Sequence, residues 1–144
     1  MAAVYRIKII SYGKSKEPWL QDALAEYEKR LTSTASISWI LAKSEAELEE
    51  NLNREESFIA LDPKGKLFSS EQFSLFLIKT LEEKKSRLTF AIGGPDGFSA
   101  KSRAKASHFL SLSPLTFTHQ ITRLLLLEQI YRAFEITRGS SYHK

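Results

Sequence analysis

Apolar and polar residues are arranged along the chain in segments that predict strands and helices in alternation. Short segments rich in β-branched and aromatic residues predict strands at residues 4–10, 37–41, 58–62, 88–92 and 109–112. Between them, helices are predicted at residues 18–31, 44–53, 69–85 and, more briefly, after Ser99. Ser44 with Glu47 and Ser69 with Gln72 have the spacing of a capping box, which indicates where two of these helices begin.

This alternation predicts an α/β fold in a single domain that spans residues 1–144. Strands that alternate with helices favour a mostly parallel sheet with helices on both faces. Ligands bind such sheets beyond the carboxyl ends of the strands. The loops at residues 62–66, 93–98 and 113–119 each follow a predicted strand, so we expect a site there.

The last predicted helix, at residues 120–137, is apolar around most of its circumference. Four consecutive leucines at positions 124–127 are joined by Ile121, Ile130 and Phe134. A helix on the surface of a domain would show a single apolar stripe. Either the rest of the domain encloses this helix on several sides, or a second copy of the chain packs against it. The second interpretation predicts a homodimer.

Positive charge is concentrated in the second half of the chain. The net charge is +4, and residues 73–144 carry 11 Lys and Arg against 5 Asp and Glu. Such a surplus attracts a polyanion such as RNA through phosphate contacts and counterion release. An unevenly charged, solvated surface is the simpler alternative.

Residue types that are missing narrow the class of protein. The sequence has no cysteine, which excludes thiolate catalysis, disulfides and cysteine-ligated zinc. Its three histidines lack the spacing of a metal site, so no metal is expected. It has neither a run of about 18 apolar residues nor a signal-peptide pattern. We therefore expect a cytoplasmic protein with no membrane partner.

Two features of the second half can carry chemistry. Residues 93–97 (GGPDG) match neither a phosphate-binding P-loop nor a dinucleotide-binding fingerprint. Three glycines in five residues indicate a tight turn or a close approach of backbone to a ligand, and the position after an apolar strand favours a ligand. His119, at the start of the last helix, is either a cap or a substrate contact.

Three segments resemble the RlmH family of SPOUT methyltransferases, and the resemblance extends along the whole chain. Residues 91–98 (AIGGPDGF) are similar to the family's IGGxxG loop. The pair His119-Gln120 with Arg123, followed by residues 127–133 (LEQIYRA), is similar to its last helix, and the YHK ending also matches. The chain departs from the family at Thr118, where members often have proline. Without proline, we expect a less rigid loop before the last helix.

The resemblance implies both a fold and an activity. The implied fold is the SPOUT α/β knot, a C-terminal trefoil knot that no sequence pattern would suggest. The implied activity is S-adenosylmethionine-dependent methylation of N3 of a pseudouridine in large-subunit (23S) ribosomal RNA, on the assembled ribosome, by a homodimer packed through the last helix. A related enzyme with another RNA target and a catalytically silent ribosome-binding protein are the alternatives.

The resemblance also assigns residues to roles. The implied cofactor contacts are Leu61, Gly93, Gly94, Leu112, Ser113, Pro114, Leu115, Thr116 and Phe117. The residues expected to contact RNA are Arg123, Arg132, Arg138, Tyr142, His143 and Lys144. For Arg132, a helix ion pair with Glu128 is an equal alternative. His119 and Glu128 are candidates to help remove the imide proton, although water can also accept it.

Overall fold

The structure is a computed structural model that describes residues 4–14 and 16–143. Its strands are β1 (Tyr5–Tyr12), β2 (Ala35–Ala42), β3 (Phe58–Leu67), β4 (Arg87–Ile92) and β5 (Ala106–Ser111). Its helices are α1 (Pro18–Leu31), α2 (Glu45–Asn53), α3 (Ser70–Glu83), α4 (Ala100–Lys105) and α5 (His119–Arg138). Strands and helices thus occur in the predicted order, with ends that differ by a few residues.

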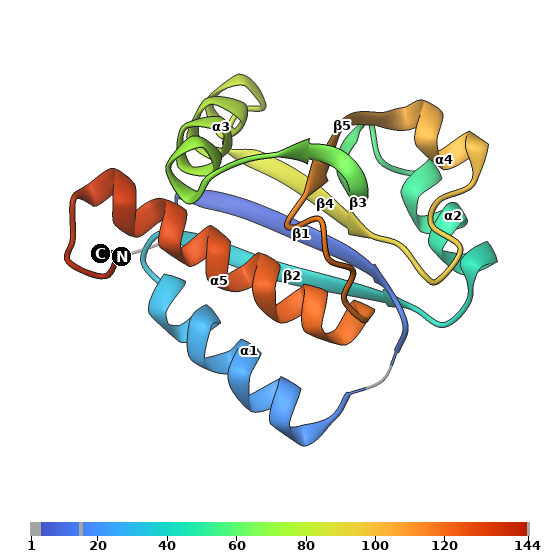
Figure 1. The fold of residues 1–144 in the computed structure, drawn as a ribbon, viewed down its shortest axis with the longest axis horizontal. Coiled ribbons are helices and arrows are strands. Elements are labelled where there is room, and N and C mark those ends of the chain that lie inside the picture. Colours follow the sequence, from blue (N-terminus) through green and yellow to red (C-terminus); the bar gives the residue numbers. More distant parts are fainter. Residues whose placement is uncertain (1–3, 15, 144) are drawn as a thin grey trace.

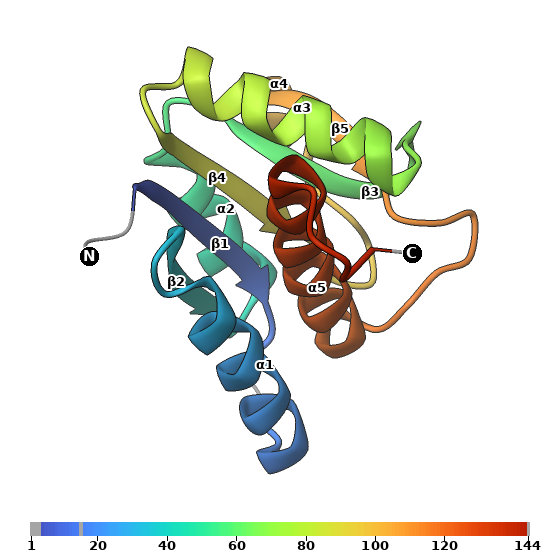
Figure 2. The same cartoon turned by 90° about the vertical axis from the view of Figure 1, so that its left-hand side faces the viewer.

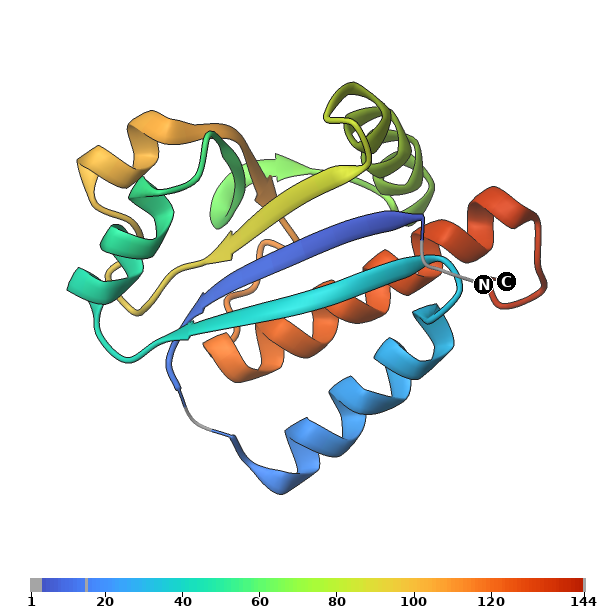
Figure 3. The same cartoon turned by 180° about the vertical axis from the view of Figure 1, so that it is seen from behind.

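The described strands form one five-stranded sheet in the order β2-β1-β4-β3-β5, and every pair in it is parallel. Figure 1 shows α1, α3 and α5 in front of this sheet, and Figure 3 shows the sheet from behind. The prediction of a mostly parallel sheet with helices on both faces is confirmed. The trefoil knot stays a prediction.

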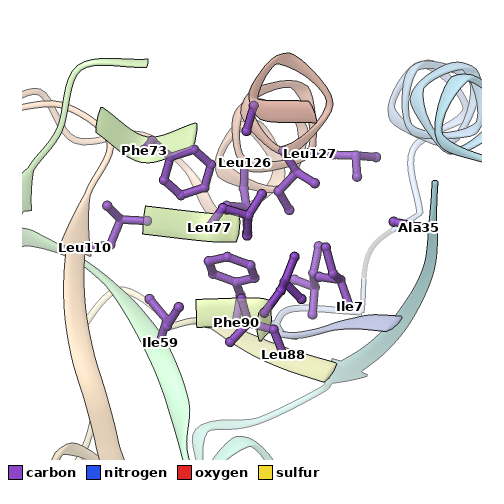
Figure 4. Packing of buried hydrophobic residues seen from close by; sticks show 14 of the residues in the cluster. Ile7, Ala35, Ile59, Phe73, Leu77, Leu88, Phe90, Leu110, Leu126 and Leu127 are labelled. Carbon is purple, nitrogen blue, oxygen red and sulfur yellow. The ribbon is translucent and has the colours of Figure 1, made fainter. Parts of the chain in front are cut away.

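Alternating residues of the strands build two apolar cores, one on each face of the sheet. Ile59 and Phe90 face α3 and α5, where they pack with Leu77 and Leu127 in the larger core that Figure 4 shows. The intervening positions, such as Ala60, face α2 and form the smaller core with its leucines. Fully burying each such side chain contributes roughly 1.5–3 kcal/mol, so the two cores fix the register of the strands.

Strand β3 is longer than the sequence predicts. A loop is predicted at residues 62–66, but β3 continues to Leu67 with an outward bulge. Both Leu61 and Lys66 pair with Leu110 of β5, so the residues between them are extra to the ladder. Gly65 explains the close return, because a Cβ atom there would lie 2.6 Å from the backbone carbon of Phe109. The bulge places Asp62 and Pro63 at the end of the sheet where the strands terminate.

The last helix is positioned between two others. Helix α5 packs against α3 on one side and α1 on the other, over the larger core (Figure 2). Its inner residues, including Leu126, Leu127 and Ile130, are fully buried. Ile121, Leu124 and Leu125 are only half-buried. The domain therefore covers most of the apolar circumference and leaves a partly exposed apolar face.

Candidate functional site

A cleft of about 400 Å³ lies at the carboxyl ends of β3, β4 and β5. The bulge of β3, the loops after β4 and β5 and the first turn of α5 form its walls, at the edge of the sheet where parallel strands predict a site. Its lining residues are Leu61, Asp62, Pro63, Ile92, Gly93, Gly94, Pro95, Gly97, Phe98, Leu110, Ser111, Leu112, Ser113, Leu115, Thr116, Phe117, His119 and Thr122.

Eight of the nine residues expected to contact a cofactor surround this one cleft. They come from β3, from the loop at residues 93–98 (the glycine loop) and from the loop after β5, which are far apart in sequence. Pro114 is the exception, because it does not line the cleft. The cleft has the size and the largely apolar walls of a small-molecule site, since such sites measure roughly 300–1,000 Å³.

The glycine loop is shaped by close contacts as well as by a turn. Gly97 donates its backbone N–H to the carbonyl of Gly94 over 3.0 Å, and Gly97 has a φ of 75°. A Cβ atom on Gly94 would lie 2.8 Å from the ring of Tyr12, and one on Gly93 would lie 3.3 Å from the ring of Phe98. The loop therefore needs small residues where it passes between two aromatic rings.

The loop after β5 is held by its own polar side chains. Ser111 donates its hydroxyl to the carbonyl of Ser113 over 2.9 Å, and Ser113 accepts the backbone N–H of Leu115 over 3.0 Å. This leaves the side chains of Leu115 and Phe117 exposed at the cleft. Thr118 accepts the N–H of Ile121 over 3.3 Å and so caps α5. A hydrogen bond thus anchors the loop where proline would have restricted φ.

His119 is the titratable side chain of α5 that lines the cleft. Its imidazole packs edge-on against Tyr12, with 5.3 Å between the ring centroids. Burial lowers the pKa of His119 below its usual value of 6.5, and the positive charge of Arg123 lowers it further. At neutral pH the imidazole is therefore uncharged and can accept a proton.

Asp62 was not singled out from the sequence, yet its carboxylate lies in the cleft wall. It accepts hydrogen bonds from Arg103 over 2.8 Å and from the backbone N–H of Lys64 over 2.9 Å. Burial alone would raise the pKa of Asp62, but these two partners outweigh burial and lower it. The group is thus a fixed anion. Only the bulge of β3 brings it into the cleft, and no local pattern of residues indicates that bulge.

Arg123, which we expect to contact RNA, makes contacts within its own chain that the sequence did not indicate. Its side chain is 1% exposed. The guanidinium donates to the hydroxyl of Ser11 over 2.9 Å and to the carbonyl of Tyr12 over 2.9 Å, and it also bonds the carbonyl of Gly13. It therefore ties α5 to the end of β1, because burial of its charge requires these acceptors.

Glu128 and the C-terminal tail form a separate cluster. Glu128 accepts hydrogen bonds from Arg132 and from the hydroxyl of Tyr142, each over 2.7 Å. Arg132 lies over the ring of Tyr142, 4.8 Å from its centroid, and contacts His143 over 2.9 Å. Burial and the adjacent Glu128 carboxylate raise the pKa of Tyr142. Glu128 is thus not in the cleft of its own chain, and the ion-pair alternative for Arg132 is confirmed.

The remaining residues expected to contact RNA lie near this cluster. Arg138 is paired with Glu135 but keeps 59% of its side chain exposed, and His143 also contacts Glu71 over 2.9 Å. Lys144 lies outside the described residues. The cleft is at the start of α5, which has 20 residues and a length of about 30 Å. The tail follows the other end of α5, as Figure 1 shows. One chain therefore does not bring the two sets together.

Two other classes of site find no support in the part of the chain that the structure describes. Its His, Asp and Glu side chains form no group of three or more that could hold a metal ion. None of its helices is both long enough and apolar enough to cross a bilayer.

Comparisons with known proteins agree with this geometry. A family described as "Predicted SPOUT methyltransferase" matches residues 5–143. A protein of Protochlamydia amoebophila named ribosomal RNA large subunit methyltransferase H is 49% identical over 96% of this chain and 99% of its own length. Proteins of the same name from Streptococcus mutans and Prochlorococcus marinus are each 40% identical, over 96% and 100% of this chain.

A solved structure shares the fold. It is described as a probable methylase family protein from Haemophilus influenzae, and it superposes with a TM-score of 0.56. The match covers 100% of this chain and 72% of the other, at 11% sequence identity. At that identity the likeness concerns the fold alone.

Proposed function

Because the chain belongs to the SPOUT methyltransferase family, among the ribosomal RNA large subunit methyltransferases H, we propose that it methylates N3 of a pseudouridine in 23S ribosomal RNA on the assembled ribosome, with S-adenosylmethionine as methyl donor. The proposal places it in the cytoplasm, with ribosomes. The observation that carries it is the meeting of the glycine loop and the loop after β5 around one cleft.

The residues around the cleft fit such a donor. Leu61, Leu115 and Phe117 offer apolar walls for an adenine, and the loop backbones at Gly93 and Ser113 offer hydrogen-bonding groups. Asp62 adds a fixed carboxylate that can accept hydrogen bonds from an amino or hydroxyl group. S-adenosylmethionine, when bound, supplies an electrophilic methyl group.

The chain's own contribution to the reaction is to position the target and to remove a proton. N3 of a pseudouridine carries an imide proton that must leave when the nitrogen is methylated. We assign its removal to His119, because this imidazole lines the cleft and is neutral at pH 7. A general base in this position contributes roughly 10²–10⁴-fold to a rate. Glu128 is the weaker candidate, because it lies at the other end of α5.

We further propose that the enzyme is a homodimer in which α5 packs against its copy. The half-buried Ile121, Leu124 and Leu125 supply an apolar surface for this contact. A two-fold axis that sets the two helices antiparallel would place the tail of one chain near the cleft of the other. This arrangement would unite the cleft with Arg138, Tyr142 and His143, which a single chain keeps apart.

Methyl transfer to ribosomes tests the proposal. Purified protein is incubated with radiolabelled S-adenosylmethionine and with ribosomes from cells that lack this protein, and the 23S RNA is digested and analysed by mass spectrometry. We expect one added methyl group on a pseudouridine. Label in another RNA would indicate a different target, and no label, together with ribosome binding, would indicate the catalytically silent alternative.

A further inference from the structure

A second cavity, of about 550 Å³, lies beside the cleft at the same edge of the sheet. It is formed by the segment after β1, by one side of α1 and by the end of β2. Lys14 and Lys16 line it together with the indole of Trp39, and Gln21 and three leucines complete the wall. Neither the reaction nor the expected cofactor contacts use these residues.

The two cavities share a thin wall. His119 lines the cleft and Arg123, one turn later on α5, lines the second cavity. Gly13 lies against both of these side chains, because a Cβ atom there would lie 2.3 Å from Nε2 of His119 and 3.1 Å from Nη2 of Arg123. Neighbouring units of one extended ligand can therefore occupy the two cavities at the same time.

The second cavity has the chemistry of a nucleotide site. Aromatic and apolar side chains such as Trp39 stack against an unpaired base, and lysine ammonium groups bind phosphate. Both lysines are exposed, and neither makes an ion pair with a described residue. The amide of Gln21 can donate to a base edge and accept from it.

Acidic groups near the cavity do not cancel this positive charge. Glu28 lines it as a carboxylate, and burial raises the pKa of Glu28 above its usual value. Glu17 lies close to Arg123 and His119 and accepts the amide of Gln120 over 3.4 Å. Lys14, Lys16 and Arg123 outnumber these two carboxylates, so the cavity keeps a net positive charge, which suits a polyanion.

We propose that the second cavity binds a nucleotide next to the target in the ribosomal RNA, with its base against Trp39 and its phosphates at Lys14 and Lys16. The inference rests on the proposed function, because it requires an RNA substrate whose target base enters the cleft. The C-terminal tail of a second copy is the competing occupant. That tail carries Arg138 and His143, so its charge is poorly matched to a cavity lined by two lysines.

Paired lysine substitutions test the inference. Lys14→Ala/Lys16→Ala is compared with Lys79→Ala/Lys84→Ala, which removes two exposed lysines from the far end of α3. We expect only the first variant to raise KM for ribosomes, by about tenfold. In this variant the slope of log affinity for ribosomes against log salt concentration should also become shallower, by about one for each lysine removed. Calorimetry should give unchanged affinity for S-adenosylmethionine.

Equal KM values for the two variants would overturn the inference. A change of mass by light scattering in the first variant alone would assign the cavity to a second copy. If the unaltered protein neither binds S-adenosylmethionine nor methylates ribosomes, the proposed function itself fails.

The fluorescence of Trp39 reports directly on whether a base binds against its indole ring. The chain has two tryptophans, so Trp19→Phe leaves Trp39 as the single reporter. Adding a short oligouridylate should quench its emission saturably, and the added Lys14→Ala/Lys16→Ala pair should weaken the binding about tenfold. Emission that does not respond up to millimolar oligonucleotide would contradict a base at Trp39.

Discussion

Single residues of this chain set the shape of the cleft through contacts that leave no room for other side chains. A Cβ atom on Gly94 would lie only 2.8 Å from the Tyr12 ring, and Gly13 passes between His119 and Arg123. Arg123 in turn holds β1 to the start of α5. The loops that form the cleft therefore depend on a few small residues and one buried cation.

Gly94→Ala should damage the cleft more than the fold. The added methyl group must displace Tyr12, and overpacking of this kind costs about 1–3 kcal/mol. We expect the Kd for S-adenosylmethionine, measured by calorimetry, to rise at least about tenfold. Gly139→Ala is the matched control, because Gly139 has open space around it and a positive φ of 72°. It should lower stability by roughly 1 kcal/mol and leave the Kd unchanged; equal Kd values for both variants would contradict the prediction.

Arg123→Met should destabilise the protein because it removes the donors that Ser11 and Tyr12 use. The substitution leaves the Ser11 hydroxyl and the carbonyls of Tyr12 and Gly13 without this donor, and at roughly 1–3 kcal/mol for each buried unpaired group the loss should total about 3 kcal/mol or more. Urea unfolding at fixed protein concentration measures the loss. Arg54→Met removes an arginine that is largely exposed, as is its partner Glu50, and should cost less than about 1 kcal/mol. A similar small cost for both would show that Arg123 is dispensable to the fold.

The lowered pKa of His119 predicts a pH profile. As a base, the imidazole must be neutral, so its reactivity is complete above its pKa and is lost as the pH falls through it. Because that pKa lies below 6.5, the single-turnover methylation rate should lose less than half of this contribution between pH 8 and 6.5 and should fall further at lower pH. His119→Gln should lower the rate by about 10²-fold or more, in the lower range of general-base effects. A rate that His119→Gln leaves unchanged would assign the proton to water.

At the scale of elements, the capped helices and the buried strands could be predicted from the sequence because their signals are local. The Ser69–Gln72 capping box forms with both of its hydrogen bonds, and Ser44 caps α2 as expected. The bulge of β3 could not be predicted, since it depends on contacts of Gly65 with the distant β5. The burial of Arg123 was missed for the same reason, because its partners lie more than 100 residues away.

The tail after α5 is an element whose role can be separated from that of the cleft. Deleting residues 142–144 removes the Tyr142 hydroxyl from Glu128 but removes no residue that lines the cleft of its own chain. We expect affinity for S-adenosylmethionine to stay within about twofold while methylation of ribosomes falls at least about tenfold, consistent with loss of roughly 1.4 kcal/mol of substrate binding. Calorimetry and the methyl-transfer assay measure the two effects. Equal losses in both would indicate that the tail serves folding.

At the scale of the whole molecule, the segments that form the cleft lie at one edge of the sheet, and the length of α5 separates the cleft from the tail. The parallel order of the strands made the position of the cleft predictable, because all carboxyl ends lie at one edge. The residue roles came from family resemblance, since no rule of spacing distinguishes a cofactor loop from a plain turn. The separation of the tail from the cleft became visible only in three dimensions.

If the chain is a homodimer as proposed, light scattering at micromolar concentration should give a mass of about twice 16.4 kDa. Leu124→Glu places a charge on the half-buried face of α5 and should give a monomer that no longer methylates ribosomes. Leu75→Glu, on the exposed side of α3, should remain dimeric and active. A single-chain mass for the unaltered protein would contradict this part of the account.

We expect the bulge of β3 and the loops after β4 and β5 to form a pocket for a methyl donor. Calorimetric titration of the protein with S-adenosylmethionine, alone and with ribosomes present, tests it most directly. We predict saturable binding that Gly94→Ala weakens and Gly139→Ala does not. Absence of saturable heat under both conditions, from protein shown to be folded, would contradict the claim.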